Sequence, residues 1–281
     1  MNPSPPLIGE GKGERSTCPQ HLNMLAGVIL TYNEAAHIAA CIDSLRWADE
    51  VVVFDSFSTD GTVELARQAG ARVLQHPFAN YAQQRNAALD AVEADWVFFV
   101  DADERATPEL AAEVRSVLAR EENGWWVPRH NYIFGQLTKG AGWYPDYQMR
   151  LLRRGAARYD PARPVHELVI LEGKAGHLSH PLIHYNYATL AEFMAKQARY
   201  TEYEARRFYQ QGVRPKPHHY LSQPLRHFYW RFITLRGYRD GLHGLRLSLL
   251  MAYYNFEMYR RLGQLWRAPR DIPPTQQLTH P

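Results

Sequence analysis

Two hydrophobic patterns alternate along the first part of the chain. Unbroken apolar runs, typical of strands buried on both faces, occupy residues 24–30, 51–54 and 97–100, and a shorter strand is predicted at 72–74. Apolar positions at helical spacing occur at 35–47, 63–69, 81–92 and from 108 onward. Because strand and helix alternate with short links, the pattern predicts an α/β fold with a mostly parallel sheet and helices on both faces.

Polar residues at the element ends support these boundaries. Asn33 is the predicted N-cap of the first helix, and Asp60 is the predicted cap of the second. Gly61 allows a tight turn at this point, and Gly70 closes the second helix. Pro108 stands in the first turn of the fourth helix, where its missing N–H costs nothing.

The pattern changes after residue 122. Aromatic-rich strands are predicted at 124–134 and 147–152, a loop at 135–145, and another strand within 161–171; helical spacing then returns over about 189–210, 217–235 and 239–262. The chain therefore divides into a disordered leader (1–22), an α/β domain (23–187), a helical region (188–268) and a flexible tail (269–281). The leader lacks the apolar core of a signal peptide, and no apolar run is long enough to predict a transmembrane helix.

Charge is distributed unevenly between the two halves. Residues 1–187 carry 17 Lys and Arg against 23 Asp and Glu, whereas residues 188–281 carry 15 against 6, with 16 aromatic residues. The basic, aromatic C-terminal region predicts an anionic partner, either an anionic membrane surface or a phosphorylated saccharide. No recognition motif supports nucleic acid. Because Cys18 and Cys41 are the only cysteines, we expect a reduced, cytoplasmic protein. The basic C-terminal region leads us to expect that it lies peripherally on the inner membrane face.

Apolar residues also recur at helical spacing within this C-terminal region, at Leu242, Leu245, Leu249, Tyr253 and Phe256. A stripe of this kind is typical of a helix that packs on the preceding domain, or of an amphipathic helix at a membrane. We expect packing on the preceding domain for much of this stripe.

Three polar stretches follow predicted strands, at residues 31–34, 55–60 and 101–103. In parallel α/β sheets ligands bind beyond the carboxyl ends of the strands, so these stretches are expected at one rim. If the chain stays extended, Asp101 and Asp103 lie on the same side. Their repulsion would be relieved by a divalent cation such as Mg²⁺. A solvated turn is the alternative.

The motifs at this rim resemble those of glycosyltransferase family 2. They are Leu30-Thr31-Tyr32-Asn33-Glu34, Asp55-Ser56-x-Ser58-x-Asp60-Gly61-Thr62, Arg85-Asn86 and Asp101-Ala102-Asp103. The resemblance implies an inverting, nucleotide-sugar-dependent enzyme with a GT-A fold at 23–187 and a C-terminal helical extension. Val165-His166-Glu167 and the Gly-Tyr-x-Asp-Gly sequence at 237–241 are similar to the lipopolysaccharide-core heptose glucosyltransferases. That subgroup implies glucose transfer from UDP-glucose to a membrane-associated saccharide acceptor.

Each rim residue has a chemical role that fits a nucleotide sugar. Asp55 can accept hydrogen bonds from uracil and ribose, and Tyr32, beside Thr31, offers an aromatic face to the base. Arg85 presents a charged fork to base or phosphate. The ordinary alternatives are a turn aspartate, a core tyrosine and a solvated helix arginine. Glu34 is either a ligand contact or a first-turn helix charge.

The resemblance also implies a metal site and a place for the catalytic base. Asp103 is the implied direct ligand of Mg²⁺ or Mn²⁺, and Asp101 is implied to lie near the ribose. Inverting transfer needs a base for the acceptor hydroxyl, and the Glu-Asp motif of many relatives is absent at the corresponding position. We therefore assign Glu167 as the base; a structural carboxylate paired with Arg163 is the alternative.

Two histidines are further candidates at this site. His166 is either a metal or phosphate contact or a hydrogen-bonded structural residue, and His184 is a weaker candidate for the same role.

Two other classes of protein compete with this interpretation. A nucleotidyltransferase also ends a strand in Asp-x-Asp, but it would need a Gly-rich loop with a lysine near the first strand, which residues 31–34 do not provide. A non-catalytic sugar-nucleotide-binding module remains possible on the motifs alone. A dehydrogenase is disfavoured, because no Gly-x-Gly-x-x-Gly follows the first strand.

Overall fold

The computed structural model describes residues 23–161 and 168–267. The main sheet has the strand order β3-β2-β1-β4-β8-β6-β12-β5, with β7 and β11 paired to β6, and a separate two-stranded sheet joins β9 and β10. The strands are β1 (Leu25–Thr31), β2 (Glu50–Asp55), β3 (Arg72–Gln75), β4 (Trp96–Asp101), β5 (Glu104–Ala106), β6 (Gly124–Ile133), β7 (Gln136–Leu137), β8 (Tyr147–Arg153), β9 (Ala157–Tyr159), β10 (Val169–Leu171), β11 (Ala175–His177) and β12 (Leu182–Tyr187). The α-helices are α1 (Ile38–Asp43), α2 (Thr62–Gln68), α3 (Tyr81–Ala91), α4 (Pro108–Val117), α5 (Leu190–Gln210), α6 (His219–Tyr229) and α7 (Gly241–Arg267).

The predicted parallel half is confirmed. Strands β3, β2, β1 and β4 run parallel, and their registers place Thr31 opposite Asp55 and Leu30 opposite Asp101. Alternate residues of these strands face opposite sides of the sheet. One side packs against α1, α2 and α4, and the other packs against α3. Both faces are therefore covered by helices, and the polar ends of β1, β2 and β4 meet at one rim.

A mixed half completes the sheet beyond β4. Strand β8 is antiparallel to β4, β6 is antiparallel to β8, and β12 runs parallel to β6. The three-residue strand β5 pairs antiparallel with β12, with His184 opposite Glu104. The sequence patterns did not predict β5, β7, β9, β11 or β12; β7 lies within the predicted loop at 135–145. The β5–β12 pairing matters most, because it brings His184 to the end of β4.

The beginning of the first helix differs from the prediction. Helix α1 spans only Ile38–Asp43, and its N-cap position is His37 rather than Asn33. Asn33 has a left-handed backbone with a φ of 56°. Its side-chain oxygen accepts a hydrogen bond from the backbone N–H of Thr59 at 2.8 Å. Asn33 therefore joins the loops after β1 and β2, and the predicted N-cap role is wrong.

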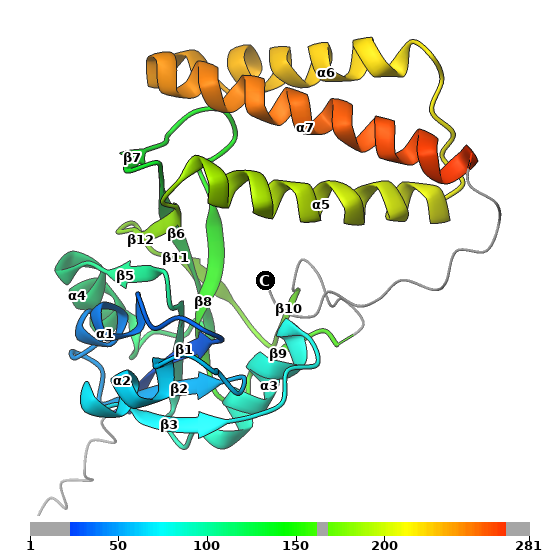
Figure 1. The fold of residues 1–281 in the computed structure, drawn as a ribbon. Coiled ribbons are helices and arrows are strands. Elements are labelled where there is room, and N and C mark those ends of the chain that lie inside the picture. The colour runs from blue at the N-terminus through cyan, green and yellow to red at the C-terminus, as the bar shows by residue number, and fades with distance from the viewer. Residues whose placement is uncertain (1–22, 162–167, 268–281) are drawn as a thin grey trace, which may run out of the picture.

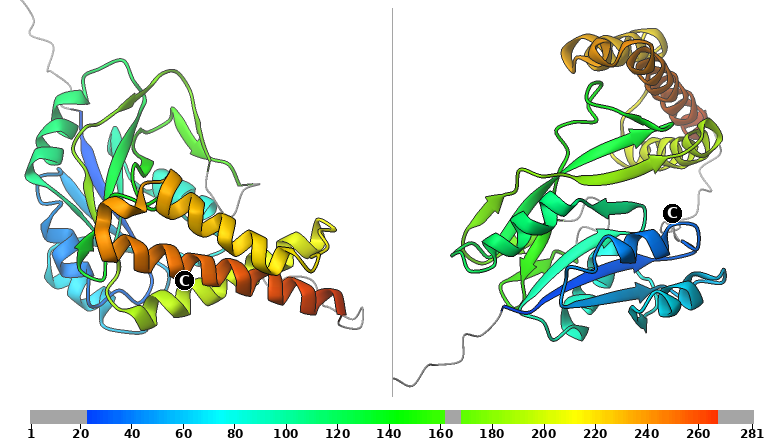
Figure 2. Two further views of the ribbon diagram at one scale, coloured as in Figure 1. Left: turned by 90° about the horizontal axis from the view of Figure 1, so that it is seen from above. Right: turned by 90° about the vertical axis from the view of Figure 1, so that its left-hand side faces the viewer.

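The C-terminal region is helical, as predicted. Thr189 and Glu192 form a capping box at the start of α5, while α6 continues into a π-helical turn at Trp230–Thr234 and a 3-10 turn at Gly237–Asp240. Both α5 and α6 pack against α7. Figures 1 and 2 show these helices as a separate layer beside the sheet, with α5 nearest to it. In the described part of the chain, no helix is both long enough and apolar enough to cross a bilayer.

Candidate active site

Asp55 anchors the rim between β1 and β2. Its side chain is fully buried, and its carboxylate accepts hydrogen bonds from the Thr31 hydroxyl at 3.2 Å, the Gln75 amide at 3.1 Å, and both the backbone N–H (2.9 Å) and the hydroxyl (2.5 Å) of Ser58. Since an ionised carboxylate offers about four acceptor sites, these donors occupy its capacity. The geometry shows Asp55 holding the two loops together. Its predicted contact with a nucleotide stays a prediction.

The loops after β1 and β2 are also joined to each other. The backbone N–H of Asn33 donates to the Ser58 hydroxyl at 2.8 Å, and the backbone N–H of Ala35 donates to the Asp60 carboxylate at 3.1 Å. The N-cap position of α2 is Gly61 rather than the predicted Asp60, although the Asp60 carboxylate accepts from the backbone N–H of Thr62, the first residue of the helix, at 3.0 Å. The rim is therefore a connected polar frame, in which Tyr32 is half-buried.

Asp101 is surrounded by arginines. It accepts from Arg85 at 3.1 Å and from both terminal nitrogens of Arg150, one of them at 3.2 Å. Arg85 is buried and packs on the rings of Phe99 and Tyr159, so it is not the solvated helix arginine considered as an alternative. Burial raises the pKa of Asp101, but the charges of Arg150 and Arg85 outweigh burial and hold the pKa well below its usual range.

The network continues through a buried glutamate. Glu104 is fully buried and accepts from Arg150 at 2.9 Å, from Arg129 at 3.1 Å and from the backbone N–H of Asp101 at 2.9 Å. Arg129 in turn pairs with Asp146 at 2.7 Å. Apart from the Nε of Arg150, which has no hydrogen-bond partner among the described residues, these buried charges are paired, and losing any partner would leave an uncompensated charge. The network therefore sets the path of the chain as it leaves β4.

That path separates the two carboxylates. Strand β4 ends at Asp101, the chain turns at residues 102–103, and β5 begins at Glu104. The chain therefore does not stay extended between Asp101 and Asp103, so the condition under which the two carboxylates were expected on the same side is not met. Asp101 is neutralised by arginines, whereas Asp103 faces His184, with 3.3 Å between its Oδ2 and the Nε2 of the histidine. Burial and the charge of Asp101 raise the pKa of Asp103, but the contact with His184 outweighs them and lowers it, so repulsion between the two carboxylates persists.

A different observation bears on the cation. The Asn131 amide donates to the Trp143 carbonyl at 2.9 Å and to the Asp146 carboxylate at 3.1 Å, so its oxygen must be the atom that faces His184 Nδ1 at 2.7 Å. His184 Nδ1 therefore carries a hydrogen, and in the neutral ring the lone pair lies on Nε2. This lone pair faces the Asp103 carboxylate.

Two electron-pair donors at this distance repel each other, and either a proton or a divalent cation between them removes this repulsion. An imidazole and a carboxylate are both ligands that Mn²⁺ accepts, and Asp103 alone suits Mg²⁺. The described residues contain no cluster of three metal-ligating side chains. The protein therefore fits a cation held by Asp103 and His184, with the other positions left to water and substrate phosphates, as is common for Mg²⁺.

Glu34 lies in the electrostatic field of the same site. Burial raises the pKa of Glu34 to about 7, the negative charge of Asp103 adds to this rise, and Lys196 on α5 opposes it. Glu34 precedes α1, and its backbone N–H donates to the Thr62 hydroxyl at 2.8 Å. A half-buried carboxyl with a raised pKa beside Asp103 marks this part of the rim as a place where a positive charge would be stabilised.

The structure brings together most of the predicted residues and adds several. Arg85, Asp101 and Asp103 are linked through one set of hydrogen bonds that includes Arg150, Glu104 and His184, whereas Thr31 and Asp55 belong to a second set that joins the loops after β1 and β2. Arg150 is the clearest omission from the prediction. It stands among the apolar residues of β8 and is almost fully buried, and a charge inside an apolar strand could have signalled a buried ion pair. Arg163, His166 and Glu167 lie outside the described residues.

The parallel strands, the polar rim at their carboxyl ends and the mixed strands beyond β4 define the α/β transferase class with a GT-A fold. Comparisons with known proteins agree. The profile of "Glycosyl transferase family 2" matches residues 28–158. The chain is 32% identical over 245 residues to the lipopolysaccharide core biosynthesis glycosyltransferase LpsC of Rhizobium meliloti (strain 1021), covering 83% of this chain and 89% of that protein. The chain therefore belongs to glycosyltransferase family 2.

Two further matches are more distant. An uncharacterized glycosyltransferase of Rickettsia bellii (strain RML369-C) is 26% identical over 257 residues, which cover 86% of each chain. Among solved structures, glucosyl-3-phosphoglycerate synthase of Mycobacterium tuberculosis, in complex with Mn²⁺, UDP-glucose and phosphoglyceric acid, is 28% identical. It covers 37% of this chain and 42% of its own, with a TM-score of 0.34.

Proposed function

We propose that this glycosyltransferase moves a hexose, most consistently glucose from UDP-glucose, to a saccharide acceptor of the lipopolysaccharide core, with inversion at the anomeric carbon. The observation that carries the proposal is the polar rim at the ends of β1, β2 and β4, with the Asp103–His184 pair beside it. The similarity to LpsC, whose name refers to lipopolysaccharide core biosynthesis, supports the acceptor class.

The donor would lie across the rim. Tyr32, half-buried at the end of β1, would offer its ring to the base, and the Thr31–Asp55 frame would fix the base and ribose from below. Asp101 would face the ribose, held in place by Arg85 and Arg150. Because these side chains are already fixed by their hydrogen bonds, donor binding would cost little ordering of the protein.

Asp103 and His184 would hold a Mg²⁺ or Mn²⁺ ion. When bound, such an ion neutralises charge that grows on the departing diphosphate. Asn131 orients His184 through Nδ1, and this orientation directs Nε2 toward Asp103. Lys196, whose charge reaches both Glu34 and Asp103, would add positive charge on the α5 side of the site.

The acceptor hydroxyl would need a base as it attacks the anomeric carbon, and we propose Glu167 for this role. Glu167 lies in the chain after the strands of the parallel half, in the region where relatives carry their acidic base. A carboxylate is suited to the task, since it can accept the proton directly from a bound hydroxyl.

A panel of sugar nucleotides tests this function directly. The protein is incubated with each donor and Mn²⁺, and release of the nucleoside diphosphate by slow hydrolysis is measured without acceptor. UDP-glucose should be cleaved, and a chelator should stop the cleavage. Addition of a lipopolysaccharide-core saccharide should accelerate diphosphate release in the wild type but not in Glu167→Gln, although UDP binding by that variant stays unchanged. Absence of cleavage with every donor would favour a non-catalytic binding module.

A further inference from the structure

The outer face of α6 carries an apolar stripe that no described residue covers. Leu221, Leu225, Tyr229 and Ile233 recur every four residues and are 69, 58, 61 and 42% exposed. None of the side chains of α6 is fully buried, and its opposite face packs against α7. A soluble helix normally buries its apolar stripe and exposes its polar face. Helix α6 instead leaves large apolar side chains in solvent.

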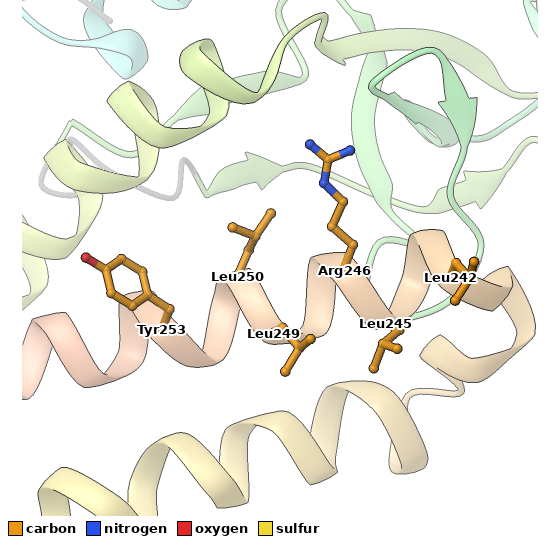
Figure 3. A pocket seen from close by; sticks show the side chains of 6 residues that line it. All are labelled: Leu242, Leu245, Arg246, Leu249, Leu250 and Tyr253. Carbon is orange, nitrogen blue, oxygen red and sulfur yellow. The ribbon is translucent and has the colours of Figure 1, made fainter.

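Helix α7 adds a groove beside this stripe. The groove has a volume of about 410 Å³ and is lined by Leu242, Leu245, Arg246, Leu249, Leu250 and Tyr253. Figure 3 shows Leu245 and Leu249 pointing toward α6, whereas Arg246 and Leu250 point to the side of α5. Leu242 is 83% exposed, which is the largest exposure among the large apolar side chains of the described residues. The groove therefore adjoins α6, and the two helices present one apolar surface.

This surface is called here the α6–α7 face. Its exposed apolar and aromatic members are Leu221, Leu225, Tyr229, Trp230, Ile233, Leu242, Leu249 and Tyr253, and its exposed basic members are Arg226 and Arg239.

The α6–α7 face is strongly basic. Residues 211–256 contain seven Lys and Arg and a single acidic residue, Asp240, which gives a net charge of +6. The carboxylate of Asp240 is already engaged, since it accepts from the backbone N–H groups of Gly140 at 2.6 Å and Lys139 at 3.3 Å. Arg226 and Arg239 make no ion pair with any described residue. Their charges are therefore directed to solvent or to an anionic partner.

We propose that the α6–α7 face binds the surface of an anionic lipid bilayer. Amphipathic helices lie in the bilayer interface with apolar side chains among the acyl chains and basic side chains near the headgroups. Tyrosine and tryptophan favour the same boundary, since each has an apolar ring and a polar atom. A second copy of this chain would instead bring together two segments that each carry a net charge of +6. Charge complementarity therefore favours anionic lipid over self-association.

The position of the face suits the proposed reaction. Figure 1 shows α5 between the sheet and α7, and Lys196 on α5 lies close enough to influence Glu34 and Asp103. The active site thus lies on one side of α5 and the α6–α7 face lies on the other. This use of the face rests on the proposed function, because a lipid-linked saccharide would be presented at the membrane. The binding itself is argued from the helices alone.

Vesicle flotation of the full chain tests the proposal. The protein should float with phosphatidylcholine vesicles that contain phosphatidylglycerol, remain behind with pure phosphatidylcholine, and dissociate at high salt. Arg226→Glu with Arg239→Glu should weaken partitioning by at least about a hundredfold, and Leu225→Ser with Leu242→Ser should weaken it by about tenfold or more. The matched control is Arg67→Glu with Arg154→Glu, which makes the same change in net charge on exposed positions of the α/β domain and should float like the wild type.

Three results would overturn the proposal. They are equal binding to both kinds of vesicle, absence of binding to either, or dimerisation that the leucine variants abolish without any vesicle binding. Donor hydrolysis in vesicle-free solution is measured for every variant. Hydrolysis without flotation would reject only the membrane surface, whereas flotation without hydrolysis would reject only the proposed function.

Discussion

At the scale of single residues, His184 changes the account of this site most. In the sequence it is a lone histidine between Ile183 and Tyr185, in a strand that the patterns did not predict, yet its ring lies between Asn131 and Asp103. The Asn131 oxygen accepts a hydrogen bond from Nδ1, so the ring is oriented with Nε2 toward the Asp103 carboxylate. A residue without a motif of its own thus becomes a ligand candidate through its neighbours.

His184→Ala should weaken Mn²⁺ binding in the presence of UDP by at least about tenfold, which corresponds to about 1.4 kcal/mol. The physical reason is the loss of one of the two protein ligands. Calorimetric titration of Mn²⁺ measures the affinity. His180→Ala is the matched control, since the His180 side chain is exposed and its partner is Glu113 on α4 rather than a residue of the rim. Equal Mn²⁺ affinity in wild type and His184→Ala would remove the histidine from the metal site.

Glu34→Gln should raise thermal stability at pH 8 relative to the wild type, with little difference at pH 4. In the folded protein the carboxyl has a pKa of about 7, against 4.5 for an ordinary glutamate. The native state therefore keeps the proton longer than the unfolded chain, so the wild type loses stability as the pH rises through this interval. The glutamine has no charge to bury.

Unfolding temperatures of Glu34→Gln and wild type are compared across this pH range, without divalent cation or nucleotide. Glu64→Gln on α2 is the control, because Glu64 is exposed. A difference that does not grow between pH 4 and 8 would contradict the raised pKa.

At the scale of elements, the parallel half was predictable from the sequence and the mixed half was not. Strands β1, β2 and β4 are continuous apolar runs, and such runs show in the sequence because both faces are buried. Strands β5 and β12 are short and rich in polar residues, and their pairing depends on contacts far apart in the chain. The first helix was predicted too long because Asn33 makes a long-range contact with Thr59 instead of a cap.

The same contrast applies to the site. Asp55, Arg85 and Asp103 follow predicted strands or lie on a predicted helix, so their motifs show directly in the sequence. Arg150 and Glu104 stand next to Asp101 only because β8 is adjacent to β4 and the chain turns into β5. Local patterns carry no information about such a pairing. The network could therefore be recognised only after the sheet order was known.

Helix α5 lies between the α6–α7 face and the candidate site, and its N-terminal cap offers a test. Thr189→Ala removes the capping box and should cost about 1 kcal/mol of stability. It should also slow donor hydrolysis, because fraying of the first turns displaces Lys196 from the neighbourhood of Glu34. Thr107→Ala removes the corresponding cap of α4 and should cost similar stability without slowing hydrolysis. If both variants hydrolyse the donor equally, α5 does not position the site.

At the scale of the whole molecule, the chain consists of three parts that differ in burial and in charge. The parallel half is a buried scaffold that holds rigid polar loops at one rim. The mixed half contributes the arginine–carboxylate network and His184, which complete the rim from the other side. The helical layer is basic and leaves apolar side chains exposed, unlike the acidic α/β half. The arrangement places the polar rim and the α6–α7 face on opposite sides of α5.

The central claim is that Asp103 holds a divalent cation that joins the nucleotide to this rim. Calorimetric titration of UDP into the wild type, with Mn²⁺ and with chelator, tests the claim most directly, with Asp103→Asn as the variant and Asp43→Asn on α1 as the exposed control. We predict that Mn²⁺ strengthens UDP binding by at least about tenfold in the wild type and in Asp43→Asn, and that Asp103→Asn loses this gain while remaining folded. Equal UDP affinity in Mn²⁺ and in chelator, or an undiminished gain in Asp103→Asn, would contradict the account.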